Sequence, residues 1–108
     1  MNKEDVVNRF GLTKMQIKKI ERFILEIFEF NKHTNIVGKS TLENVWERHI
    51  ADSLQLSLFI SKKKSKIFDL GTGGGLPGIP LSVLGYSNVF MVDSVGKKID
   101  FVRSVTKL

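Results

Sequence analysis

The residues with the most evident chemical potential surround a glycine-rich turn. Asp69 lies near the end of a short apolar run, and Gly71, Gly73 and Gly75 follow it at alternate positions. Glycines at such a turn let the backbone pass close to a ligand and direct the N–H groups of the following helix towards it. Asp93 follows a second apolar run, and a carboxylate at a strand end can accept hydrogen bonds from both hydroxyls of a ribose. Together these residues indicate a site for a nucleotide-type cofactor.

The glycines match two patterns. Residues 73–78 fit the dinucleotide-binding pattern, whereas residues 69–75, an acid followed by alternating glycines, are typical of methyltransferases that use S-adenosylmethionine. Pro77 and Pro80 remove N–H donors from the start of the next helix, which disfavours a phosphate ligand. Asp69 suits the cationic end of S-adenosylmethionine, and we favour that cofactor. A turn that only reverses the chain is the remaining alternative, and Ser94 either caps the last helix or supports the adenosine site.

A second group of residues with polar and charged side chains spans positions 48–53, with the sequence Arg-His-Ile-Ala-Asp-Ser. On a helix, His49 and Asp52 share a face because they are three residues apart, and Arg48 can pair with Asp52 four residues on. One histidine and one aspartate are too few ligands for a metal ion, and the chain contains no cysteine. We therefore expect no metal site.

The first half of the chain is predicted to be mainly helical. Residues 3–10 form a short helix ended by Gly11, and residues 13–16 provide a capping box for a helix that runs to about residue 30. A polar loop spans residues 31–39, and a second capping box at residues 40–43 begins another helix. The apolar stripe of the long helix predicts a core face, formed by Ile17, Ile20, Phe23, Ile24, Ile27 and Phe28.

The second half alternates strands and helices. We expect a strand at residues 66–70, a helix at 80–84, a strand at 89–92 and a helix from about Gly96 whose apolar face carries Ile99, Val102, Val105 and Leu108. This order predicts a parallel, right-handed βαβα unit. Two strands are few for a parallel sheet, which is normally covered on both faces, so the chain reads as the N-terminal part of a longer α/β protein. The expected division is a helical segment at 1–61 and an incomplete Rossmann-like domain at 62–108.

Charge and composition narrow the class of protein. The 108 residues carry a net charge of +6, which favours polyanionic partners, although solvated lysines, as in the run at residues 61–66, account for it equally well. No apolar run reaches the length of a membrane span, and the first residues do not resemble a secretory signal peptide. We expect a monomeric cytoplasmic protein without membrane contact.

Four segments carry a resemblance to a known family: residues 31–37, residues 48–53, residues 68–81 with Gly-Leu-Pro-Gly-Ile-Pro, and residues 92–98. In these segments the chain resembles the bacterial small-subunit (16S) ribosomal RNA guanine-N7 methyltransferase G family (RsmG, glucose-inhibited division protein B). The resemblance implies a class I, Rossmann-like methyltransferase fold, here apparently truncated. It also implies methyl transfer from S-adenosylmethionine to N7 of a guanine in the decoding region of 16S rRNA. It assigns cofactor contacts to Asp69, Gly71, Gly73, Gly75, Leu76, Asp93 and Ser94, and substrate positioning to Arg48, His49 and Asp52.

The implied reaction needs few groups. Guanine N7 already presents a lone pair, so no general base is expected, and catalysis rests on alignment and electrostatics. On this hypothesis Asp52 stabilises the cationic guanine and His49 positions it. Family members are longer than this chain, so the activity is that of a longer parent protein. The alternatives are a catalytically inactive basic RNA-binding or assembly fragment and, less favoured because the first half is helical, an NAD-dependent oxidoreductase.

Overall fold

The chain begins with two helices that are closed by local hydrogen bonds. The computed structural model describes residues 1–35 and 37–107. Helix α1 (Lys3–Phe10) is capped by Asn2 and ends at Gly11, whose φ of 61° is left-handed. Helix α2 (Lys14–Asn31) begins with a capping box in which Thr13 accepts from the backbone N–H of Gln16 and the Gln16 side chain accepts in return. The two predicted helices, the capping box at residues 13–16 and the stop at Gly11 are confirmed.

The segment after α2 departs from the prediction. It contains the 3₁₀ helix η1 (Lys39–Asn44), the π-helix η2 (Trp46–Ala51), the short α-helix α3 (Asp52–Gln55) and the 3₁₀ helix η3 (Leu56–Phe59). The predicted capping box at residues 40–43 is wrong, because η1 begins after Gly38 and no side chain caps it. A π-helix widens the turn to hydrogen bonds between residues five apart, so the four-residue spacing of an α-helix does not apply here.

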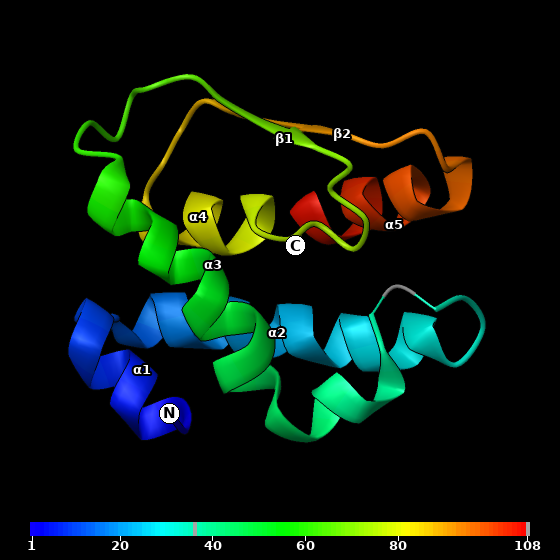
Figure 1. Cartoon of the computed structure of the whole chain (residues 1–108), viewed down its shortest axis with the longest axis horizontal. Coiled ribbons are helices and arrows are strands. Elements are labelled where there is room, and N and C mark those ends of the chain that lie inside the picture. The colour runs from blue at the N-terminus through cyan, green and yellow to red at the C-terminus, as the bar shows by residue number, and fades with distance from the viewer. Residues whose placement is uncertain (36, 108) are drawn as a thin grey trace.

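The second half follows the predicted order. Strand β1 (Ile67–Leu70) leads to helix α4 (Gly78–Leu84), strand β2 (Val89–Val92) and helix α5 (Gly96–Thr106). The strands are parallel, with Ile67 paired with Val89 and Leu70 paired with Val92. Within the described ranges the sheet has these two strands only. Figure 1 shows the sheet above α4 and α5, with α2 below them and α1 beneath α2. The chain is thus an α/β arrangement with βαβα order.

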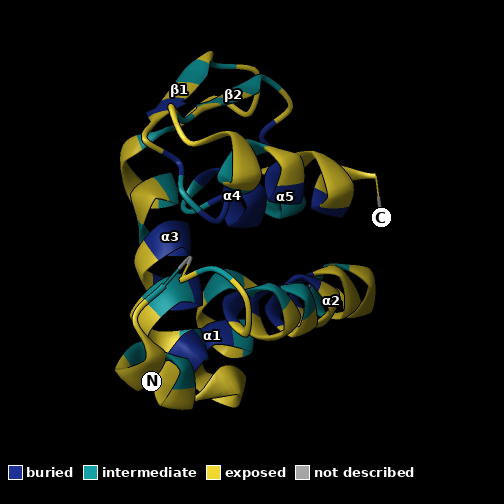
Figure 2. Cartoon of the chain, turned by 90° about the vertical axis from the view of Figure 1, so that its right-hand side faces the viewer, coloured by how far each residue is buried: buried dark blue, intermediate teal, exposed yellow. Residues whose placement is uncertain are grey.

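The hydrophobic core lies where α2 and α3 meet α4 and α5, as the buried segments in Figure 2 show. Phe23 is 1% exposed, Ile20, Ile27 and Leu54 are fully buried, and the rings of Phe30 and Phe101 lie 4.8 Å apart. Most of the predicted α2 stripe is therefore confirmed, but Phe28 is 40% exposed. Val102 and Val105 of α5 are buried as predicted, and Leu108 lies outside the described residues. Residues from both sides of position 61 contribute to the same core. The division of the chain into a helical segment at 1–61 and a Rossmann-like domain at 62–108 stays a prediction.

The segment between η3 and β1 is fastened to the turn after α4. Buried Tyr86 donates from its hydroxyl to the carbonyl oxygen of Ile60 at 2.6 Å. Lys63 places its ammonium 4.3 Å from the centre of the Tyr86 ring, and the Asn88 side chain donates to the carbonyl oxygen of Lys64 at 2.7 Å. These contacts set where β1 begins and hence where its glycine-rich end lies.

The outer face of the sheet is apolar and open. Its side chains are 62% exposed at Phe68, 77% at Leu70, 47% at Phe90 and 50% at Val92, and the two phenylalanine rings stack with centroids 5.1 Å apart. Parallel sheets are normally covered on both faces. Over the described residues, α4 and α5 cover the inner face. Separately, none of the described helices is long and apolar enough to cross a bilayer.

Candidate functional site

Asp69 organises the glycine-rich loop from within. The residue is 8% exposed, and its Oδ2 accepts from the Thr72 hydroxyl at 2.6 Å and from the Gly78 N–H at 2.9 Å. One carboxylate oxygen therefore joins the end of β1, the loop and the start of α4. Gly78 leaves space for this contact, since a Cβ there would lie 2.9 Å from Oδ2 and 2.6 Å from Met91. Sequence reasoning overlooked Thr72, although a hydroxyl three residues after a buried acid is a recognisable turn signal.

The glycines of the loop have different surroundings. Gly71, Gly73 and Gly75 all have positive φ, at 72°, 58° and 91°, which disfavours any residue with a Cβ. A Cβ on Gly71 or Gly73 would meet no atom within 4 Å, whereas one on Gly75 would lie 2.4 Å from Ile79. Gly71 and Gly73 thus border open space that a ligand can occupy. Packing against α4 accounts for Gly75, whose predicted cofactor contact stays a prediction.

Asp93 ties the end of β2 to the same loop. Its Oδ2 accepts from the Gly73 N–H at 2.8 Å and its Oδ1 from the Val95 N–H at 2.9 Å. These backbone bonds, that of Val95 first, hold the pKa of the Asp93 carboxyl below its usual range. The group is an anion at neutral pH, and each oxygen keeps a further lone pair for a ligand. Asp69 and Asp93 thus hold the glycine loop from its two sides.

Ser94 does not cap the last helix. The residue that precedes α5 in the cap position is Val95, and no side chain bonds to the free N–H groups of this helix start. The capping alternative for Ser94 is therefore wrong. Ser94 follows Asp93 in the chain, and its contact with a cofactor remains a prediction.

The second group of predicted residues lines one cavity with the glycine-rich loop. A hollow of about 270 Å³ is bounded by Arg48, His49, Asp52, Ser53 and Leu56 on one side and by Leu76 and Pro77 on the other. The fold thus brings the proposed substrate-positioning residues next to the predicted cofactor residue Leu76. The Arg48–Asp52 ion pair that helical spacing allowed is not among the ion pairs of the described residues. The π-helical turn explains this, because it changes the offset between positions 48 and 52.

His49 is held by specific hydrogen bonds. Its Nε2 lies 2.7 Å from the Thr41 hydroxyl, and its carbonyl oxygen accepts from the Ser53 hydroxyl at 2.7 Å. Burial lowers the pKa of the imidazole, the Asp52 charge opposes that shift, and the Arg48 charge adds to it. The ring is therefore mainly neutral at neutral pH. Thr41 lay inside the predicted capping box, and nothing in the sequence pointed to its contact with His49.

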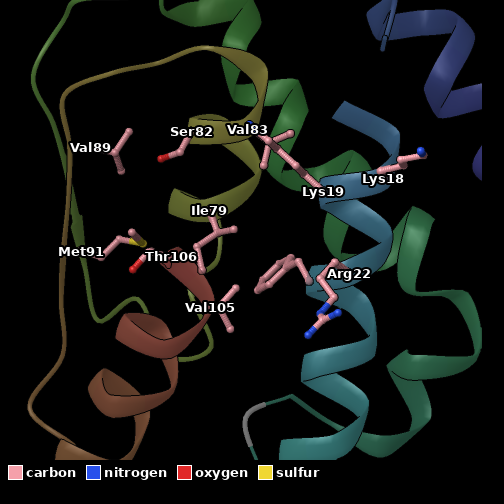
Figure 3. A pocket seen from close by; sticks show the side chains of 11 residues that line it. Lys18, Lys19, Arg22, Ile79, Ser82, Val83, Val89, Met91, Val105 and Thr106 are labelled. Atoms are coloured by element: carbon pink, nitrogen blue, oxygen red, sulfur yellow. The ribbon is translucent and has the colours of Figure 1, made fainter. Parts of the chain in front are cut away.

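A second hollow, of about 480 Å³, lies away from these residues. Figure 3 shows side chains of α2 on one side of it and of α4, β2 and α5 on the other. Its walls are largely aliphatic, with Ile79, Val89 and Met91 among them, and Lys18, Lys19 and Arg22 supply positive charge. None of the predicted site residues lines this hollow. Among the residues that the structure describes, no cluster of three or more histidine or acidic side chains could hold a metal ion.

Comparison with known proteins identifies the family of this chain. The family model described as "rRNA small subunit methyltransferase G" (GidB) matches residues 16–108. A protein of that name from Rhodospirillum centenum is 35% identical over 99 residues, which is 92% of this chain and 46% of the relative. Relatives of the same name from Rickettsia prowazekii and Magnetococcus marinus are 39% identical over 92 residues and 41% over 91. These two matches include 85% and 82% of this chain, and 48% and 41% of the respective relatives.

The match extends over most of this chain, which spans about half the length of the curated relatives it matches. It includes the glycine-rich loop, Asp93 and the segment that carries His49. The chain belongs to the rRNA small subunit methyltransferase G family.

Proposed function

We propose that this chain forms the N-terminal part of a methyltransferase that uses S-adenosylmethionine to methylate N7 of a guanine in the decoding region of 16S rRNA. Membership of the family and the βαβα order support a class I, Rossmann-like fold for the parent protein. The observation that carries the proposal is the contact between Asp93 and the Gly73 N–H at 2.8 Å. It joins a ribose-binding carboxylate to a loop whose glycines border open space.

The residues fit the proposed cofactor. Gly71 and Gly73 leave room beside the loop, and the anionic Asp93 can accept hydrogen bonds from the ribose hydroxyls. Leu76 offers an apolar contact between the loop and the cavity, and Ser94, which follows Asp93, can contact the adenosine. Asp69 and Gly75 act indirectly, because both are buried and shape the loop. When bound, S-adenosylmethionine supplies a methyl group activated by its sulfonium.

The cavity residues fit the proposed substrate. The N7 lone pair forms the new bond to the methyl carbon while the electron pair of the old bond leaves with sulfur, so no proton has to move. Positive charge then develops on the guanine ring, and the exposed carboxylate of Asp52 can stabilise it. Arg48, also exposed, can bind a phosphate of the RNA, and His49 can hold the base. The net charge of +6 favours the polyanionic substrate.

Calorimetric titration of the 108-residue chain with S-adenosylhomocysteine tests the proposal. Gly71→Ala should abolish saturable binding, because it adds a methyl group and backbone strain at the loop. Gly11→Ala is the matched control, since Gly11 has a φ of 61°, also borders open space and lies at the end of α1. The control should lose stability to a similar degree and keep its affinity. Equal affinity of the Gly71 and Gly11 variants would contradict the proposed cofactor site.

A second function has two observations in its favour. The chain spans about half the length of its relatives, and the outer face of its sheet is uncovered, as in a partner-dependent fragment. A basic RNA-binding or assembly fragment would bind RNA with a steep salt dependence and would not bind S-adenosylhomocysteine. Membership of a methyltransferase family does not support the oxidoreductase alternative. Competition between NAD and S-adenosylhomocysteine in the same titration distinguishes that alternative from a methyltransferase.

A further inference from the structure

The Thr41 hydroxyl makes two short contacts, and the donor and acceptor roles at one contact determine the roles at the other. Its Oγ1 lies 2.6 Å from the carbonyl oxygen of Gly38 and 2.7 Å from Nε2 of His49. A hydroxyl has a single hydrogen to donate and two lone pairs with which to accept. A carbonyl oxygen can only accept, so the Thr41 hydrogen points to Gly38. At the other contact Oγ1 must accept, and Nε2 of His49 must therefore carry a hydrogen.

We infer that Thr41 is a positioning residue that holds His49 in the Nε2-protonated tautomer and leaves the lone pair of Nδ1 free to accept a hydrogen bond from the substrate base. Within the described part of the chain, no hydrogen bond reaches Nδ1. The imidazole is half-buried and lines the cavity with Leu76 and Pro77. Its neutral form is the form with an acceptor nitrogen.

The acceptor of the Thr41 hydrogen is itself held in place. Asn31 is 6% exposed, and its side chain donates to the carbonyl oxygen of Val37 and accepts from the Val37 N–H, both at 3.2 Å. Val37 precedes Gly38, so the end of α2 positions the carbonyl oxygen that orients Thr41. A chain of contacts thus runs from Asn31 through Val37, Gly38 and Thr41 to the ring of His49.

The charges around His49 favour the neutral ring overall. Burial and the Arg48 charge lower the pKa of the imidazole, and the Asp52 charge opposes them to a smaller extent than burial does. A neutral ring also avoids a like charge beside the cation that forms on guanine. The backbone of His49 is fixed by Ser53, which donates to its carbonyl oxygen.

This geometry indicates how the site selects its base, an inference that rests on the proposed function for the identity of guanine. With N7 directed to the methyl group, the exocyclic N2 amino group of guanine remains a hydrogen-bond donor, and adenine has no amino group at that position. Nδ1 of His49 accepts from this amino group. The residue thereby contributes to guanine specificity, and Thr41 contributes by fixing which ring nitrogen accepts.

Long-range ¹H–¹⁵N correlation spectra of the labelled chain test the tautomer directly. The wild-type chain and Thr41→Ser should both show His49 protonated at Nε2 and unprotonated at Nδ1. Thr41→Val keeps the shape of the side chain but removes the acceptor, so the spectrum should change to a mixture of tautomers. The exposed His33 is an internal reference. A wild-type His49 that is protonated at Nδ1, or that shows the same mixture as His33, would overturn the inference.

Titration with guanosine and inosine 5′-monophosphates then tests the contact with the base. The Nδ1 resonance of His49 should move saturably with the guanine nucleotide and not with the inosine nucleotide, which lacks the N2 amino group. An equal response to both, or none to either, would refute the contact. Titration with S-adenosylhomocysteine reports on the cofactor site separately, so failure here is distinguishable from failure of the proposed function.

Discussion

At the scale of single residues, the two acidic side chains beside the glycine-rich loop have different roles. Asp69 is buried and uses one oxygen to accept from the Thr72 hydroxyl and the Gly78 N–H, so it acts on the shape of the loop. Asp93 binds the Gly73 and Val95 N–H groups and remains partly open to solvent. A loop held from both sides is preorganised for a ligand, because little ordering remains to be done on binding.

The lowered pKa of Asp93 predicts how stability depends on pH. Its contribution to the free energy of unfolding is complete above the ordinary carboxyl pKa of about 3.9 and is lost as the pH falls through the lowered value. Asp93→Asn should therefore lose less stability than the wild type on acidification. Urea unfolding over a series of pH values measures the slope. Asp100→Asn, which changes an exposed aspartate on α5, is the control, and a slope equal to the wild type in Asp93→Asn would contradict the assignment.

At the scale of elements, the π-helical turn η2 determines how the second motif is presented. It places Arg48 and His49 on the cavity wall that faces Leu76 and Pro77 without an ion pair between Arg48 and Asp52. π-helical turns are frequent at functional sites, since the wider turn re-aims side chains. Among the described residues, neither Arg48 nor Asp52 forms an ion pair, so both charges can interact with a substrate.

Helix α2 carries the cations that lie beside the larger hollow, and we expect them to bind RNA phosphates. Lys18→Gln/Lys19→Gln should reduce the slope of log affinity against log salt by about 0.7 for each phosphate that the protein no longer neutralises. Lys62→Gln/Lys64→Gln removes the same charge from the segment before β1 and is the matched control. Fluorescence anisotropy with a single-stranded 16S rRNA segment at several salt concentrations gives the slopes. Equal reductions in the two variants would mean that only net charge matters.

At the scale of the whole molecule, the uncovered outer face of the sheet is the most unusual feature. Contiguous exposed apolar side chains mark surfaces for interaction, and the stacked rings of Phe68 and Phe90 form the centre of this one. The relatives are about twice as long as this chain, and the surface is a candidate contact for a segment equivalent to the remainder of their length.

The exposed face should bind a hydrophobic dye. Phe68→Thr/Phe90→Thr should lower the fluorescence of bound 1-anilinonaphthalene-8-sulfonate markedly, because both residues contribute to one patch and threonine remains compatible with a strand. Phe59→Thr removes an 85% exposed ring from η3, outside the sheet, and should have a smaller effect. Circular dichroism would verify that each variant remains folded. A larger decrease of fluorescence in Phe59→Thr would contradict the role of the sheet face.

The sequence by itself determined the features that depend on neighbouring residues. Helix α1 with its stop at Gly11, the start of α2 at Thr13, both strands and α5 were predictable, because caps, positive-φ glycines and apolar periodicity act within a few residues. The glycine-rich turn and the acid at the end of β2 were recognisable for the same reason. The predicted cap at residues 40–43 failed, and the Thr41 hydroxyl contacts the Gly38 carbonyl oxygen and His49 instead.

Only the tertiary structure decided which distant groups meet. The bond from the Gly73 N–H to Asp93 spans 20 residues, and Gly78 approaches Asp69 where α4 packs against β2. The contact of Thr41 with His49 and the cavity shared by His49 and Leu76 depend on the π-helical turn and on the docking of α3 against α4. Such contacts arise from the packing of the core, whose contributions come from the entire chain, and no local pattern encodes them.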